Sequence, residues 1–121
     1  MSNLPRYTDT DIDEDMKLTR GDYIKILHHY QPGLRKTHSR RMSLKTAKEH
    51  ADRILAGKLC RCIKSSSSDE ESRRIAYCTS SIFNNRGLRR HGFRCKTSRG
   101  AVRPRLTGDI TKRTRKLRLS R

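Results

Sequence analysis

The sequence has little of the material from which a hydrophobic core is built. It contains no Trp, two Phe and four Tyr, and 31% of its 121 residues are apolar, against about 45–50% in ordinary globular domains. A low apolar fraction combined with a high net charge favours disorder. We therefore expect any folded region of this chain to need a covalent or metal-based support in addition to its core.

Long apolar runs and a signal peptide are also missing. No apolar run approaches the roughly 20 residues that cross a bilayer, so no membrane span is predicted. The stretch after Met1 is polar and then acidic, unlike the start of a secretory signal peptide. We therefore expect a protein that is not secreted and that folds in a reducing compartment. Cysteines in such a compartment are more often metal ligands than disulfides.

Acidic residues are scarce as well. Twelve Asp and Glu stand against thirty Lys and Arg, which gives a formal net charge of +18. A charge of this sign and size predicts a polyanionic partner, either nucleic acid or an acidic protein surface. Binding to nucleic acid is expected to run mainly through phosphates, because Lys and Arg near the backbone release counterions. No helix-turn-helix or two-Cys-two-His pattern is present, so base-specific recognition is not predicted.

The chain has four cysteines, and all of them lie between residues 60 and 95. Four thiolates are enough to close a tetrahedral zinc site. Residues 59–64 are interpreted as a short strand or knuckle, in which positions i and i+2 face the same way and both sulfurs reach one ion. Two disulfides, or free or buried thiols, are the alternatives. The favoured prediction is a structural Zn²⁺ bound by Cys60, Cys62, Cys78 and Cys95, with His91 as an alternative ligand.

Hydrophobic periodicity predicts three short helices, at residues 19–31, 44–57 and 72–85. Thr19 and Asp22 have the spacing of a capping box, Ser43 is a plausible N-cap, and Gly57 is the expected stop of the second helix. Residues 88–96 are expected to form a basic turn and a short strand. The predicted fold is small and mainly α with minor β: three helices around a four-cysteine, zinc-stapled centre, with disordered or extended basic tails.

Charge divides the chain into three parts. Residues 1–18 form an acidic N-terminal tail, 19–96 the helical module, and 97–121 a basic C-terminal arm from which no core is expected. The acidic block at residues 9–15 is expected to be solvated. An alternative is that it folds back on the basic surface and competes with the polyanion. The predicted polyanion contacts are Arg35, Lys36, Arg40, Arg41, Arg89, Arg90, Arg99, Arg103, Arg105, Lys112, Arg113, Arg115, Lys116 and Arg118.

Three stretches carry a resemblance to a known group of proteins. The run from Lys45 to Lys64, with Ala76–Phe83 and Gly92–Cys95, resembles small cysteine-containing basic proteins of large and giant DNA viruses. The resemblance implies a virion, or the host cytoplasm or nucleus during viral replication, and possible assembly with other virion proteins. It carries over the four cysteines and no catalytic residue. Such viruses often encode thiol oxidases, which would allow disulfides in virions assembled in the cytosol.

Three functions are compatible with these features. The favoured one is a non-catalytic protein that binds nucleic acid, for example in genome packaging or transcription. The alternative is a minor capsid or cement protein whose basic arm lies along acidic capsid surfaces. An enzyme would need a nucleophile such as Cys60 paired with His50 or His91. No paired carboxylates, phosphate-binding glycine loop or oxyanion motif accompanies that pair, so the protein is predicted not to be an enzyme.

Overall fold

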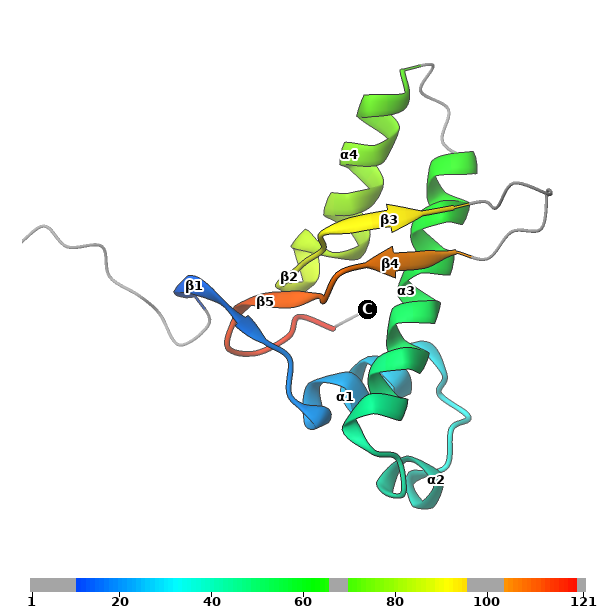
Figure 1. Cartoon of the computed structure of the whole chain (residues 1–121), viewed down its shortest axis with the longest axis vertical. Helices are drawn as coiled ribbons and strands as arrows, with labels where there is room; N and C mark the ends of the chain where they lie inside the picture. Colours follow the sequence, from blue (N-terminus) through cyan, green and yellow to red (C-terminus); the bar gives the residue numbers. More distant parts are fainter. Residues whose placement is uncertain (1–10, 66–69, 96–103, 120–121) are drawn as a thin grey trace, which may run out of the picture.

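The computed structural model describes residues 11–65, 70–95 and 104–119 (Figure 1). The helices are α1 (Arg20–Tyr30), α2 (Lys36–Arg40), α3 (Leu44–Ser65) and α4 (Glu71–Ile82), followed by a 3-10 turn at Asn84–Arg86. The strands are β1 (Asp11–Lys17), β2 (Leu88–Arg89), β3 (Gly92–Arg94), β4 (Arg105–Thr107) and β5 (Thr111–Thr114). None of the helices in the described part of the chain has the length and apolar character needed to cross a membrane.

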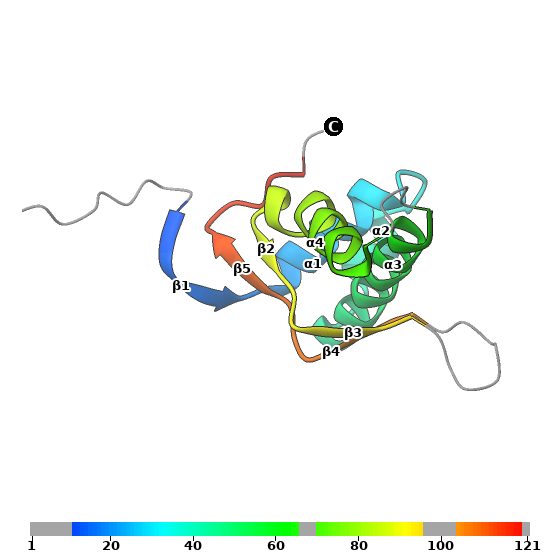
Figure 2. The same cartoon turned by 90° about the horizontal axis from the view of Figure 1, so that it is seen from above.

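Two small sheets flank the helices. Seen from above, α3 and α4 lie side by side (Figure 2), and the β3–β4 hairpin crosses α3 (Figure 1). The other sheet has the strand order β1-β5-β2. Its strands are antiparallel, with β5 in the middle. The two sheets meet at one corner, because only two residues separate β2 from β3 and three separate β4 from β5.

Helix α1 confirms the first predicted helix and its cap. Thr19 Oγ1 accepts a hydrogen bond from the Asp22 amide at 3.1 Å, and the Thr19 amide donates to Asp22 Oδ2 at 2.9 Å. This reciprocal pair satisfies two amides at the open start of the helix. Tyr23, Ile26 and Leu27 are buried, and α1 packs against α3.

Helix α3 is longer than the sequence indicated. Its buried stripe repeats every four residues and continues past Gly57 to Leu59 and Cys60. Gly57 is a buried residue in the interior of the helix. The Arg61 guanidinium packs over it, and a Cβ at this position would lie 3.3 Å from Arg61 Nη1. A helical glycine costs about 1 kcal/mol relative to Ala. Burying Leu59 returns more than that, so the predicted stop at Gly57 is wrong.

Helix α4 confirms the third predicted helix. Cys78 and Ile82 on α4, and Phe83 directly after it, are buried. They join side chains from α1, α3 and the strands in one core. The members of that core are Leu18, Tyr23, Ile26, Leu27, Met42, Ala47, Ala51, Leu55, Leu59, Cys78, Ile82, Phe83, Leu88 and Ile110.

The described part of the C-terminal segment is folded, which corrects the expectation of a disordered or extended tail. Strands β4 and β5 lie within it, and Ile110 is 1% exposed in the core. Phe93 pairs with Leu106 across the hairpin, and both pack against the core. Exposed residues alternate with less exposed ones along β4 and from Lys112 to Thr114, so each strand keeps one face wet and turns the other inward.

The three-stranded sheet β1-β5-β2 begins where Gly87 lies close to the end of β5. Gly87 follows the 3-10 turn with φ +81°, in the left-handed region that favours glycine. A Cβ at this position would overlap Thr114 Oγ1. The Gly87 carbonyl accepts from the Arg113 amide at 2.7 Å, which seats β5 against β2.

One buried ion pair joins α1 to β5. Lys112 Nζ lies 2.7 Å from Asp22 Oδ2, and the two side chains are 8% and 9% exposed. Burial alone would raise the pKa of the Asp22 carboxyl. The hydrogen bonds and charge from Lys112, together with the bonds from Thr19, outweigh burial and lower this pKa below its ordinary value. Asp22 is therefore ionised in the fold and holds both its helix cap and the middle strand.

Lys112→Met should remove most of the stability that this pair provides. The substitution leaves a buried carboxylate without its cation, which costs about 3 kcal/mol or more of unfolding free energy. Urea unfolding followed by circular dichroism measures this loss. The matched control is Lys116→Met at an exposed position of the same segment, where a change within about 0.5 kcal/mol is expected. Equal losses in both variants would show that the ion pair is not special.

The same pair predicts loss of stability in acid. The folded pKa of Asp22 lies below its unfolded value, so the unfolded state binds the proton more readily. Its contribution is complete above the unfolded pKa of about 4 and is lost as the pH falls through the lowered folded pKa. Asp22→Asn should be less stable than wild type at neutral pH, and the difference should shrink below about pH 4. Glu49→Gln, at an exposed position, is the control and should show the same loss of stability in acid as the wild type.

Candidate polyanion-binding surface

The four cysteines do not converge, so the predicted zinc site is wrong. Cys60 and Cys62 lie on helix α3 and not on a strand, and positions i and i+2 of a helix point about 200° apart. Each therefore meets a different partner. Cys60 is bonded to Cys95 and Cys62 to Cys78, with Cα–Cα distances of 5.4 and 5.8 Å. Zn²⁺ has no ligand set here, and the fold is held by two disulfides.

The alternative zinc ligand is not placed for that role either. His91 is exposed and lies beside Gly108 in the turn between β4 and β5. Within residues 11–65, 70–95 and 104–119, no three side chains of His, Cys, Asp or Glu are grouped to hold a metal ion.

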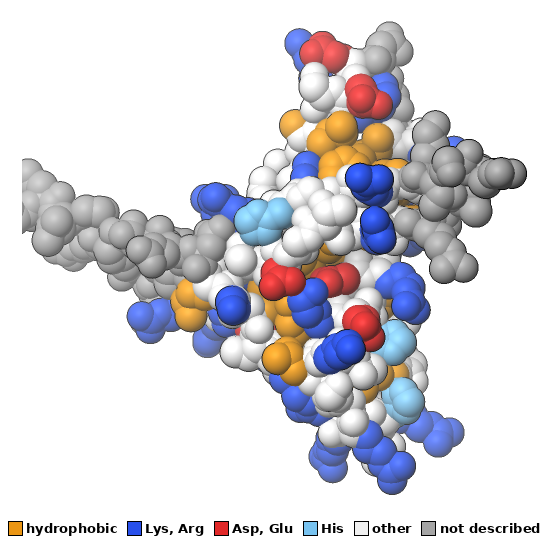
Figure 3. Space-filling model, in the orientation of Figure 1, with side chains coloured by type: hydrophobic (Ala, Val, Ile, Leu, Met, Phe, Trp, Pro, Cys, Tyr) orange, Lys and Arg blue, Asp and Glu red, His pale blue; other side chains and the backbone are white. Residues whose placement is uncertain are grey.

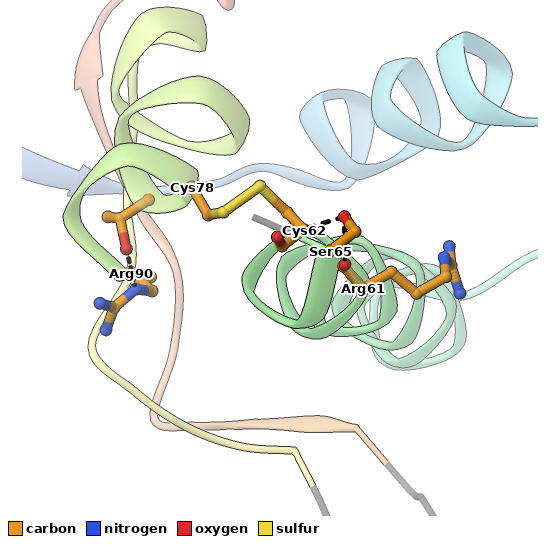
Figure 4. The surroundings of a disulfide bond; sticks show 6 residues. Arg61, Cys62, Ser65, Cys78 and Arg90 are labelled. Atoms are coloured by element: carbon orange, nitrogen blue, oxygen red, sulfur yellow. Dashed lines mark hydrogen bonds between the residues drawn. A yellow bond between two sulfur atoms is a disulfide. The ribbon is translucent and has the colours of Figure 1, made fainter. Parts of the chain in front are cut away.

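The two disulfides tie α3 to two different elements. Cys62–Cys78 joins α3 to α4, and Cys60–Cys95 joins α3 to the end of β3. Around the first bridge, Arg61 points away from the sulfur atoms (Figure 4). Ser65 Oγ donates to the Arg61 carbonyl at 2.9 Å and closes the last turn of α3. The two bridges thus cross-link the C-terminal end of α3, which is the end distant from α2.

Helix α2 was not predicted, and a single arginine of α1 holds it in place. The Arg20 guanidinium donates to the carbonyl oxygens of Ser39, Arg40 and Met42 at 2.9, 2.9 and 2.6 Å. These carbonyls end a five-residue helix that has too few internal bonds to be stable alone. The contacts span 19–22 residues, so no local sequence pattern reveals them.

A buried serine fixes the other side of α2. Ser39 is 3% exposed, and its Oγ donates to the Lys36 carbonyl at 3.0 Å. The same oxygen lies 3.0 Å from His28 Nε2 on α1. Helix α2 is therefore tied to α1 at two points, and the side chains around it are presented from a fixed backbone.

Four of the predicted cations gather on this fixed turn. Arg35, Lys36, Arg40 and Arg41 are all exposed, and we call them the α2 surface. Lys and Arg side chains crowd the lower end of the molecule, where α2 lies (Figure 3). Arg35, Thr37, His38 and Arg41 line an open pocket of about 230 Å³. Two guanidinium groups, an imidazole and a hydroxyl around one hollow suit a phosphate group.

Acidic residues are absent from the sequence around the α2 surface. No Asp or Glu occurs between Asp22 and Glu49 in the sequence. Asp52 and Asp109 both bind Lys48, at 2.9 and 3.1 Å. The hydrogen bond to Asp52 outweighs burial and raises the pKa of Lys48. The ion pairs of these two carboxylates are therefore made with Lys48.

Comparisons with known proteins found no relative. No family model, curated protein or solved structure matches this chain. We therefore infer the function of this protein from its site alone.

The remaining predicted contacts that the structure describes lie on the strands or in the residues next to them. Arg99 and Arg103 lie outside the described residues. Lys112 is buried on Asp22 and is unavailable to a partner. Arg90 is half-buried, with its Nε donating to Thr79 Oγ1 at 2.9 Å and its guanidinium over the Phe93 ring, and burial lowers its pKa. Exposed positions are Arg89, Arg105, Arg113, Arg115, Lys116 and Arg118.

A second group of cations was missed by the sequence analysis. Lys58 Nζ lies 4.9 Å and the Arg86 guanidinium 5.7 Å from the centre of the Tyr30 ring. Burial raises the pKa of Tyr30, partly offset by the charge of Arg86. The three residues come from α1, α3 and the 3-10 turn. Their separation in sequence explains why no motif announced them.

Non-reducing peptide mapping should recover both disulfides. Trypsin cleaves after Arg61, between Cys60 and Cys62, so the two bridges should appear in separate peptide pairs. Cys62→Ser/Cys78→Ser should keep the Cys60–Cys95 bridge. This variant should lose about 3 kcal/mol of unfolding free energy, because the removed Cys62–Cys78 bridge closes a loop with a sequence separation of 16. Four reactive thiols in the native, air-handled protein would contradict the assignment.

Proposed function

We propose that this protein is a non-catalytic polyanion-binding protein that contacts phosphate groups of nucleic acid through the α2 surface. The observation that carries the proposal is the pocket between Arg35 and Arg41, on a turn clamped by Arg20. Side chains on a fixed backbone lose less conformational entropy on binding than those of a flexible arm. The surface has guanidinium groups and no Phe, Tyr or Trp, which favours phosphate contacts over base stacking.

The state of the cysteines supports a non-catalytic role. The enzyme alternative required a Cys60 thiolate beside His50 or His91. Within the described residues no cysteine is free, because each of the four is part of a disulfide. A disulfide sulfur is not the nucleophile of such a pair, since nucleophilic attack requires the thiolate.

The disulfides favour a second candidate, a structural component of a virion. Disulfides persist outside the reducing cytosol, as in a particle assembled with a thiol oxidase. The resemblance to proteins of large DNA viruses implies the same setting. In that role the α2 surface would lie along an acidic neighbouring protein, and the chemistry of the contact would again be guanidinium against oxyanion.

Arg35→Ala/Arg41→Ala should weaken binding to DNA. We expect roughly a 30- to 150-fold loss of affinity, because two charge-assisted contacts are lost and each is worth about 1–1.5 kcal/mol. The slope of log K against log salt should become shallower by about 2, independent of DNA sequence. Fluorescence anisotropy with two labelled duplexes of unrelated sequence, between about 50 and 200 mM salt, measures both quantities.

The matched control is Arg61→Ala/Lys64→Ala, which removes the same charge from exposed positions at the far end of α3. It should change affinity only slightly. Poly-L-glutamate is the second probe: tighter binding to it than to the duplexes at equal salt would favour the virion structural role. Wild-type protein that binds none of these polyanions in a salt-dependent way would reject the proposal.

A further inference from the structure

The most acidic described strand lies against the most basic one. Strand β1 (Asp11–Lys17) contains Asp11, Asp13, Glu14 and Asp15, and it pairs antiparallel with β5 (Thr111–Thr114). Strand β5 and the residues after it contain Lys112, Arg113, Arg115, Lys116 and Arg118. The acidic block, expected to be solvated, thus begins a strand of the fold.

The register brings the acidic residues to one basic position. Asp11 is opposite Thr114, and Met16 is opposite Lys112. Between these two pairs β1 has residues 12–15, whereas β5 has only Arg113. The extra residues form an irregular bulge, and three of them are acidic. Along the backbone, the bulge therefore lies beside Arg113.

We infer that β1 is an internal competitor for the polyanion, which places an acidic segment beside the cations of β5 and leaves when nucleic acid binds. This inference rests on the proposed function and adds a second, regulated contact surface to it. The surface consists of Arg113, Arg115 and Lys116, all exposed and all on or after β5.

The topology allows β1 to leave without unfolding the rest. It is an edge strand in the order β1-β5-β2, so its release breaks pairing with β5 alone. The next residue, Leu18, stays in the core, and Lys112 stays bound to Asp22. Strand β5 thus keeps its anchor to α1 and its pairing with β2 while one edge opens.

The energies also favour an exchangeable contact. Ion pairs near a surface are individually weak, so each acidic charge of the segment adds little to its binding. Its advantage is proximity, because only two residues separate Lys17 from the start of α1 at Arg20 and a short tether raises the effective concentration to about the millimolar range. A polyanion adds counterion release along many phosphates, which is enough to displace it.

Asp13→Asn/Glu14→Gln/Asp15→Asn should tighten binding to the labelled duplex about tenfold at about 50 mM salt, with a smaller gain at about 200 mM. The matched control is Glu49→Gln/Glu70→Gln/Glu71→Gln, which changes the net charge equally at exposed positions of α3 and the start of α4. An equal gain in both variants would reduce the effect to net charge and overturn the inference.

Carbodiimide cross-linking tests the strand contact without reference to affinity. Free wild-type protein should form an amide between an acidic residue of 11–15 and Lys116, identified by mass spectrometry. Saturating duplex should suppress this cross-link. A cross-link that forms equally with duplex bound would mean that β1 stays in place, which overturns the inference. A protein that forms the cross-link but binds no polyanion would refute the proposed function and leave the strand contact established.

Discussion

The buried pair of Asp22 and Lys112 determines how the two ends of this chain meet. Asp22 closes the start of α1 and at the same time binds Lys112 on β5 at 2.7 Å. Because β5 is the middle strand of its sheet, the positions of β1 and β2 follow from where Lys112 is held. A buried ion pair gives little net stability, but it penalises every arrangement in which either charge loses its partner. The pair therefore selects one placement for a segment whose composition favours disorder.

Helix α3 is the hub on which the rest is assembled. Its buried stripe begins with Ala47 and Ala51, whose small side chains leave little apolar area to bury. The chain compensates covalently: Cys60 and Cys62 leave the same helix in opposite directions and bind the hairpin and α4. Cross-links of this kind act mainly on the unfolded chain by reducing its conformational entropy. A protein with few apolar residues needs this help, because its small core offsets only part of that entropy.

Charge is segregated in space. Several acidic residues are used to hold the fold together, as with Asp52 and Asp109 on Lys48. The α2 surface is left cationic and is fixed in shape by Arg20. A second cationic surface, on and after β5, lies beside the acidic strand β1. In the inferred exchange, a polyanion attached to the α2 surface would compete with β1 for this second surface.

Local patterns in the sequence determined the first and third helices, the Thr19–Asp22 cap and the cationic character of residues 35–41, because each depends on neighbours within one or two turns. The sequence also singled out the four cysteines. Which sulfur met which was decided by the tertiary structure, since the pairing turned on whether residues 59–64 continue a helix or begin a strand, and burial of Leu59 settled that. Helix α2, the folded C-terminal segment and the place of β1 likewise depend on contacts between residues far apart in the chain, from Arg20 with Met42 to Asp22 with Lys112. Such contacts leave no periodic pattern in the sequence, because they contribute energy only after folding has brought the distant residues together.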